Sequence, residues 1–147
     1  LVFSKDLPGL SGNGEETGIR IIKYHPGDEG GSFRNHEIVF RYADAYLMKA
    51  EAIMRGGSSS EDALTMVNDL RELRDASPLS SLSEQEMLDE RGRELYTEYW
   101  RRQDQIRFGT FTSTWEFKDN TEEFRVLFPI PSVALTSNPN LTQNPGY

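Results

Sequence analysis

The chain has 147 residues, a formal net charge of -8 at pH 7 and 36% hydrophobic side chains. This length and composition suit one small domain with a modest hydrophobic core. The excess of carboxylates repels nucleic acid and anionic membranes, which argues against a nucleic-acid-binding protein. The sequence has no cysteine, so it excludes disulfides, thiolate metal sites and cysteine nucleophiles.

Residues 1–36 form the first of three zones, and we expect them to be mostly loop because they are rich in glycine and interrupted by Pro8 and Pro26. Within this zone Thr17–Tyr24 is rich in β-branched residues and bounded by glycine and proline, which predicts a short strand. No apolar run is long enough for a membrane span, and the N-terminus lacks the basic-then-apolar plan of a signal peptide. Whatever targets the protein is therefore expected to lie outside this sequence.

Residues 37–109 form a helical zone, and its first helix is predicted over about Phe40–Arg55. Apolar side chains recur there at spacings of three and four, which is typical of one buried helical face. The stripe consists of Ala43, Tyr46, Leu47, Ala50, Ile53 and Met54. Two glycines, Gly56 and Gly57, are expected to end the helix.

A second helix is predicted over residues 61–76, with Ser60 as a possible N-cap. Its apolar stripe consists of Ala63, Met66, Val67, Leu70 and Leu73. Pro78 prevents the helix from continuing. Because only a short Gly/Ser turn separates this helix from the first, the two should form an antiparallel helical hairpin.

A third, long helix is predicted over about Glu84–Arg107, ending at Gly109. Ser83 and Glu86 have the spacing of a capping box at its start. On one face Glu98 precedes two arginines at spacings of three and four, so ion pairs are expected along this helix.

Three acids of the predicted third helix, Glu90, Glu94 and Glu98, share one face at spacings of four. They could form a carboxylate site for a metal ion or for acid–base catalysis. The arginines between them favour the other interpretation, in which the acids are neutralised in a salt-bridged scaffold.

Residues 110–147 form the third zone, which begins with a polar segment that carries three aromatic side chains. Phe111, Trp115 and Phe117, with Asp119 and Asn120 beside them, are candidates for a ligand-binding platform. Sugar recognition uses aromatic faces for stacking and amide or carboxylate groups for hydroxyls. The alternative, which we favour from the sequence, is a short strand or loop whose aromatic side chains cover the helices.

The chain ends in a proline-rich tail, Phe128–Tyr147, which is predicted to be extended because each proline removes an amide donor and restricts the residue before it. Asparagine–proline and proline–glycine pairs should turn the chain. Four apolar side chains are expected to cover the helices: Phe128, Ile130, Val133 and Leu135. The tail is then an ordered clamp on the helices, closed by its last residue.

No motif in the sequence predicts a catalytic residue, a metal site or a cofactor. The two histidines, His25 and His36, occur without cysteines and without the spacing of a zinc site. No glycine-rich loop has the lysine and spacing of a phosphate-binding motif, and no serine has a histidine and an acid in motif form.

Four ordered segments resemble the SusD/RagB family. They are FRYADAYLMKAEAIMRGG at 40–57, ALTMVNDLRELR at 63–74, the Glu/Arg ladder from Glu90 to Gly109, and the terminal FPIP and NPNLTQNPGY segments. The ladder departs from the family pattern at two places. Tyr99 and Trp100 stand where the family has glycine after the glutamate, and Arg102 stands where it often has an aromatic residue.

This resemblance implies a cell-surface lipoprotein of the outer membrane that captures glycan or peptide nutrients for a SusC-like TonB-dependent transporter, without catalysis. It implies a mainly α fold with a tetratricopeptide-like helical hairpin. The chain would correspond to the C-terminal part of such a protein, with the signal, the lipid anchor and the main ligand contacts outside it. Two alternatives stay open: a helical-repeat scaffold for a protein partner, and a glycan-active enzyme with paired carboxylates.

Overall fold

The computed structural model describes residues 23–24 and 37–147. The chain divides into two compact units, one of Leu1–Glu37 with Thr114–Asp119 and one of Ile38–Ser113 with Asn120–Tyr147. The predicted strand at residues 17–24 lies outside the described residues, except for Lys23 and Tyr24, which are in a turn.

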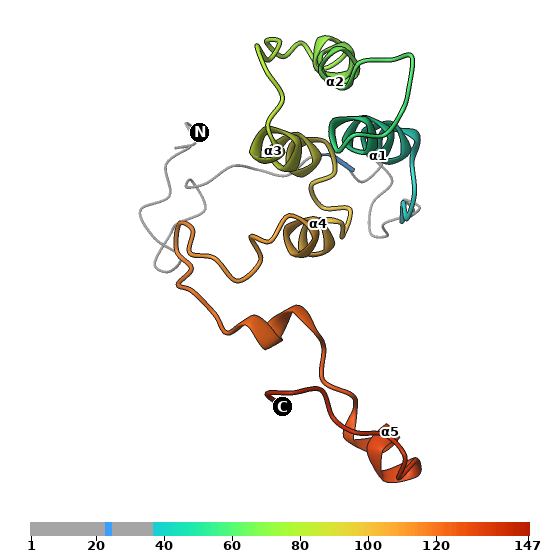
Figure 1. The fold of residues 1–147 in the computed structure, drawn as a ribbon, viewed down its shortest axis with the longest axis vertical. Helices are drawn as coiled ribbons and strands as arrows, with labels where there is room; N and C mark the ends of the chain where they lie inside the picture. The colour runs from blue at the N-terminus through green and yellow to red at the C-terminus, as the bar shows by residue number, and fades with distance from the viewer. Residues whose placement is uncertain (1–22, 25–36) are drawn as a thin grey trace, which may run out of the picture. The chain divides into compact units, whose positions relative to one another are not determined.

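The described residues form helices and loops (Figure 1). In chain order the elements are α1 (Tyr42–Met54), α2 (Ala63–Glu72), α3 (Glu84–Glu94), α4 (Arg101–Arg107), the 3-10 helix η1 (Glu123–Val126) and α5 (Ser132–Ser137). Within the described ranges the only β pairing is an isolated bridge between Trp115 and Lys118. The mainly α fold predicted from the sequence is therefore confirmed. None of the described helices combines the length and the apolarity needed to cross a lipid bilayer.

The first two helices form the predicted hairpin, and α1 also contacts α3 (Figure 1). The core that joins the three helices consists of Leu47, Ala50, Met66, Val67, Leu70 and Met87. Five of these side chains were expected from the periodicity of the first two helices. The second helix begins two residues later than predicted, because Asp62 and not Ser60 caps it by accepting a hydrogen bond from the Thr65 amide at 2.8 Å.

The predicted long third helix is wrong, because two helices replace it. α3 starts with the predicted capping box, in which the Glu86 amide donates to Ser83 Oγ and the Ser83 amide donates to Glu86 Oε2. It ends at Glu94, since Thr97 and Tyr99 have φ values of 66° and 68°, in the left-handed region that a right-handed helix cannot contain.

The break turns the chain so that α4 packs on α3. The Arg101 side chain crosses Gly92 there and its Nη1 donates to the Leu88 carbonyl at 2.8 Å. A Cβ atom on Gly92 would lie 2.6 Å from that same Nη1, so a larger residue there would displace the end of the Arg101 side chain from this crossing.

The tail differs from the extended clamp that the sequence predicted. It contains α5, and Val133 is exposed, whereas Ile130 and Leu135 are half-buried. Phe128 is also exposed, and on the helices its ring meets the guanidinium of Arg102 in α4, 4.0 Å from ring centroid to guanidinium carbon. The tail also forms hydrogen bonds within itself. The Gln143 amide group pairs with both the N–H and the carbonyl of Ile130 at 2.8 and 2.9 Å.

The last residue closes this tail loop. The Tyr147 hydroxyl donates to the Leu127 carbonyl at 2.8 Å, and its ring meets Phe124 edge-on at 4.9 Å between centroids. The tail is thus closed by Tyr147, as expected, but onto residues 124–130 of its own segment.

Candidate functional site

The acids considered for catalysis are all paired with arginines. Arg41 Nη1 and Arg74 Nη2 donate to Glu94 Oε1 at 2.6 and 2.9 Å. Burial alone would raise the pKa of Glu94, but the hydrogen bonds from these two arginines outweigh it and lower the pKa below its usual value. Glu94 is therefore held as a carboxylate.

The other two acids have the same kind of partners. Arg71 and Arg93 contact Glu90 Oε2 at 2.6 and 2.7 Å. Arg41 Nε lies 2.8 Å from Glu98 Oε2. These pairs confirm the salt-bridged interpretation of the ladder. They also join α3 to the residue before α1 and to α2, because the partner arginines come from different elements.

Arg41 was not among the residues that sequence reasoning singled out. It directly precedes α1 and bonds both Glu94 and Glu98. Arg41 is the second residue of the segment at 40–57 that resembles the family, but the local sequence does not show which acids it contacts.

A second ion-pair cluster lies deeper, between α1, α3 and α4. Arg91 is 1% exposed, and its Nη2 donates to Asp44 Oδ1 at 2.9 Å. Its Nε lies 3.0 Å from Asp104 Oδ2 without the alignment of a hydrogen bond, and its buried Nη1 has no partner. This leaves a buried N–H donor on a charged group without an acceptor.

The same cluster extends to the surface through Arg107 and Glu51. Arg107 Nε and Nη2 donate to the two oxygens of Glu51 at 2.9 and 2.8 Å, and Nη2 also donates to Asp104 Oδ1. These bonds raise the pKa of Arg107. Burial would raise the pKa of Glu51, but hydrogen bonds from Arg107 and Arg55 lower it.

Trp115 lies at the base of a tight turn within residues 114–119. Its amide donates to the Lys118 carbonyl at 3.0 Å, and the Lys118 amide donates back at 2.9 Å. Phe117, in the two-residue loop, has a φ of 62°. The indole is 41% exposed, and Lys118 Nζ lies 4.1 Å from its ring centroid. The turn thus exposes two aromatic side chains, Trp115 and Phe117.

The candidate platform residues do not all fall in one unit. Trp115 belongs to the first unit together with Asp119, which is exposed. Phe111 and Asn120 belong to the second unit, where Phe111 is half-buried and its ring lies 4.9 Å from the Arg102 guanidinium carbon. Trp115, Phe117 and Asp119, which share the first unit, can therefore be treated as one candidate group.

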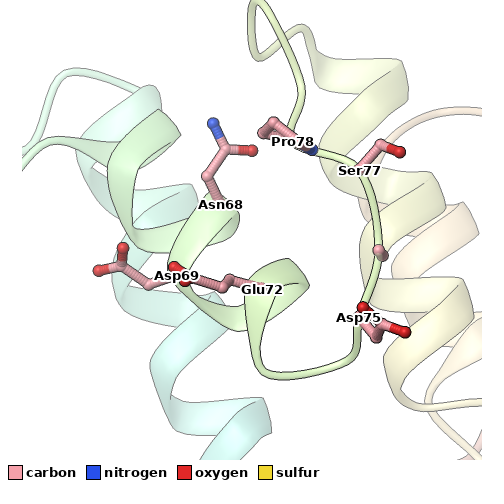
Figure 2. A pocket seen from close by; sticks show the side chains of 7 residues that line it. Asn68, Asp69, Glu72, Asp75, Ser77 and Pro78 are labelled. Atoms are coloured by element: carbon pink, nitrogen blue, oxygen red, sulfur yellow. The ribbon is translucent and has the colours of Figure 1, made fainter.

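Among the pockets formed by residues of the helical unit, three bear on function, and the first is lined by acidic side chains (Figure 2). Asp69 and Asp75 point to opposite sides of it (Figure 2). Asn68 lines this pocket and joins α2 to the loop that follows it. Its side-chain amide group donates to the Leu79 carbonyl and accepts from the Leu79 backbone amide. Among the described residues no group of three or more histidines, cysteines or acids is arranged to hold a metal ion.

The second pocket is a groove of about 400 Å³ between α1 and α2. Tyr42 and Tyr46 form its aromatic side, with ring centroids 5.9 Å apart, and Leu73 is largely exposed beside them. Burial raises the pKa of Tyr46, with a further contribution from the charge of Asp69. The groove therefore presents aromatic and apolar surface beside a carboxylate.

The third pocket, of about 320 Å³, lies where α1, α3 and α4 meet. Its lining consists of Met48, Glu51, Ala52, Arg55, Arg91, Trp100 and Arg107. Arg91 contributes little of this lining, because only 1% of the residue is exposed.

The first two helices form a hairpin, and arginine–carboxylate ion pairs join this hairpin to two further helices. This arrangement is typical of a helical scaffold domain. The chain matches the sequence model described as the SusD family over residues 4–147, and it belongs to this family. It is 34% identical, over 92% of its length, to the starch-binding protein SusD of Bacteroides thetaiotaomicron. It is 31% identical, over 90% of its length, to the SusD-like protein P38 of Formosa agariphila.

The chain spans 27% of the first of these relatives and 29% of the second. The resemblance read from the four sequence motifs is thus confirmed at the level of the family.

Proposed function

We propose that this chain is part of a SusD-like protein of the outer-membrane surface that binds glycan nutrients and does not degrade them. The family match over residues 4–147 carries this proposal, together with a relative at 34% identity that is named a starch-binding protein. Peptide ligands are the alternative within the same function. A lipid anchor and a SusC-like TonB-dependent transporter as partner complete the proposed arrangement.

The turn that carries Trp115 is the glycan contact we propose within this chain. A pyranose ring has an apolar face of C–H groups that stacks on an exposed indole, and its hydroxyls bond to nearby polar groups. Asp119 offers a carboxylate acceptor in the same unit. One indole and one acid form a small contact, so we expect the chain alone to bind glycan weakly.

The ion-paired acids support the non-catalytic part of the proposal. Glycoside hydrolysis needs one carboxylic acid that is protonated near neutral pH and a second carboxylate across the bond to be cleaved. The arginines around Glu94 lower its pKa, which is the opposite of what a general acid needs. Glu90 and Glu98 also contact arginines at 2.6 to 2.8 Å.

A gel containing soluble starch tests the proposed binding. The chain should be retarded in this gel, and Trp115→Ala should remove the retardation. Tyr42→Ala, which truncates another exposed aromatic residue in the helical unit, should not change it. Release of reducing sugar from starch by the purified protein would refute the non-catalytic assignment, and equal retardation of the two variants would refute the role of Trp115.

Isolation of the full-length protein from solubilised membranes tests the proposed partner. A SusC-like transporter should be retained with it at a fixed ratio. The helical-repeat scaffold stays a second candidate because Tyr42 and Leu73 expose apolar surface in the α1–α2 groove, and recovery of another protein in place of a transporter would favour it.

A further inference from the structure

The groove between α1 and α2 presents apolar surface that the helices leave uncovered. Tyr42, the first residue of α1, is 80% exposed, and Leu73, at the end of α2, is 76% exposed. The half-buried ring of Tyr46 and the buried Leu70 also line the groove. Large apolar side chains that share one exposed patch often mark an interaction site.

One charge in this groove is not balanced by a partner. The two arginines that line it, Arg41 and Arg74, are both ion-paired with Glu94, and Arg41 has a second glutamate partner. The exposed carboxylate of Asp69, in contrast, has no ion-pair or hydrogen-bond partner within residues 23–24 and 37–147. Burial raises the pKa of Tyr46, and the charge of Asp69 raises it further, so this carboxylate acts on the aromatic side of the groove.

Further carboxylates continue from Asp69 around the end of α2. Asp69 also lines the acidic pocket, together with Glu72 and Asp75 (Figure 2). The side chains of Glu72 and Asp75 likewise have no ion-pair partner in the part of the chain that the structure describes. Because α2 ends at Glu72, the negative end of its helix dipole lies in the same place. A segment that leaves the groove across the end of α2 would therefore meet three carboxylates.

These charges decide which occupant fits the groove. An acidic segment would be repelled, and a purely apolar one would cover Asp69 without giving it a partner, which is costly. Two copies of the chain repel each other, since each has a net charge of -8. A lysine or arginine has an apolar stem that can lie along Tyr46 and a cation that can pair with Asp69. A free amine would leave Leu73 uncovered, whereas a peptide segment can cover it.

We propose that the α1–α2 groove is a docking site for a basic amphipathic segment of a protein partner. An apolar side chain of this segment packs on Tyr46 and Leu73, and a lysine or arginine on the same side pairs with Asp69. This is a protein contact and goes beyond the binding of glycans, so it holds or fails independently of the Trp115 turn.

Fluorescence anisotropy with synthetic peptides tests this contact. The probe is a labelled helical peptide of leucine and lysine that has its leucines on one face, and its acidic counterpart has glutamate in place of every lysine. The basic peptide should bind the chain saturably with one peptide per chain, and the acidic peptide should not bind. Because the carboxylates are exposed, salt should screen them and weaken the binding.

Two substitutions in the groove have matched controls elsewhere in the chain. Asp69→Asn should weaken binding of the basic peptide about threefold to fivefold, the effect of losing an exposed ion pair. Glu116→Gln, which removes an exposed carboxylate outside the groove, should leave it nearly unchanged. Leu73→Ala should weaken binding about tenfold, because the partner then covers less apolar surface. Leu141→Ala, the same change at an exposed leucine of the tail, should have no effect.

Three results would overturn the proposal. They are equal binding of the acidic and basic peptides, equal losses in the groove variants and their controls, and self-association of the chain that Leu73→Ala abolishes. The last of these would make a second copy the occupant. Asp69 and Leu73 are exposed, so both variants should fold, and circular dichroism checks this. Retardation in the starch gel should be the same for Asp69→Asn as for the parent chain, which separates this test from that of the proposed function.

Discussion

Replacement of Asp44 by asparagine removes the charge that faces Arg91 while it keeps the size of the side chain. Both side chains are almost fully buried, at 1% and 2% exposure, and their polar atoms lie 2.9 Å apart. At about 4 Å between charge centres and an effective dielectric constant of about 20, the attraction is about 4 kcal/mol. Removing one partner of a buried pair costs about 3–5 kcal/mol, since the remaining charge stays buried.

Arg91 keeps Asp104 at 3.0 Å in this variant, and the asparagine carbonyl can still accept from Nη2. We therefore expect a loss somewhat below that range, about 2–3 kcal/mol in the free energy of unfolding. Urea denaturation at neutral pH, followed by circular dichroism, measures this loss.

Glu122→Gln is the matched control, because it removes the same charge from the exposed pair of Glu122 with Arg125. Exposed pairs are screened by water and contribute little, so its midpoint should hardly move. A loss below about 1 kcal/mol for Asp44→Asn, or one no larger than that of the control, would refute the view that the buried pair holds α1 to α3.

Three further predictions concern pH, helix capping and the tail. Because Glu51 and Glu94 have lowered pKa values in the folded state, their contribution to stability is present above the unfolded-state pKa of about 4.3 and is lost as the pH falls through the folded-state values. Urea midpoints should fall on acidification in this window, and less steeply in Glu94→Gln. Ser83→Ala removes the capping box of α3 and should cost about 1 kcal/mol by the same assay, whereas Ser80→Ala should not. Arg102→Ala should speed amide hydrogen exchange in residues 124–130 more than Arg102→Lys does, and equal exchange in the parent chain and both variants would contradict this.

The helical hairpin could be predicted because its signals are local. The spacing of apolar residues on α1 and α2 predicts which side chains form the core, such as Leu47 and Val67. The capping box at Ser83 predicts where α3 starts. Each of these features depends on residues within one or two turns, where backbone geometry alone decides which side chains meet.

The break between α3 and α4 could not be predicted, because Thr97 and Tyr99 are not residues that usually adopt a left-handed backbone. Tertiary contacts outweigh that local cost. The turn brings Glu98 to Arg41 and lets Arg101 cross Gly92 to reach the Leu88 carbonyl. Trp115 could be named as a candidate from the sequence, but its exposure could not be predicted, because exposure depends on distant parts of the chain.

The departures from the family pattern lie where the ladder meets the tail and the third pocket. Arg102 stands where the family often has an aromatic residue, and its guanidinium carbon lies 4.0 Å from the Phe128 ring centroid and 4.9 Å from that of Phe111. Its Nη2 also donates to the Val126 carbonyl at 3.0 Å. A flat cation can stack on two rings and bond a carbonyl at once, which an aromatic side chain cannot do.

Trp100 is the second departure, and it lines the third pocket, where a glycine would leave no ring. The same short stretch that breaks the predicted helix therefore supplies both the link to the tail and the indole of the third pocket.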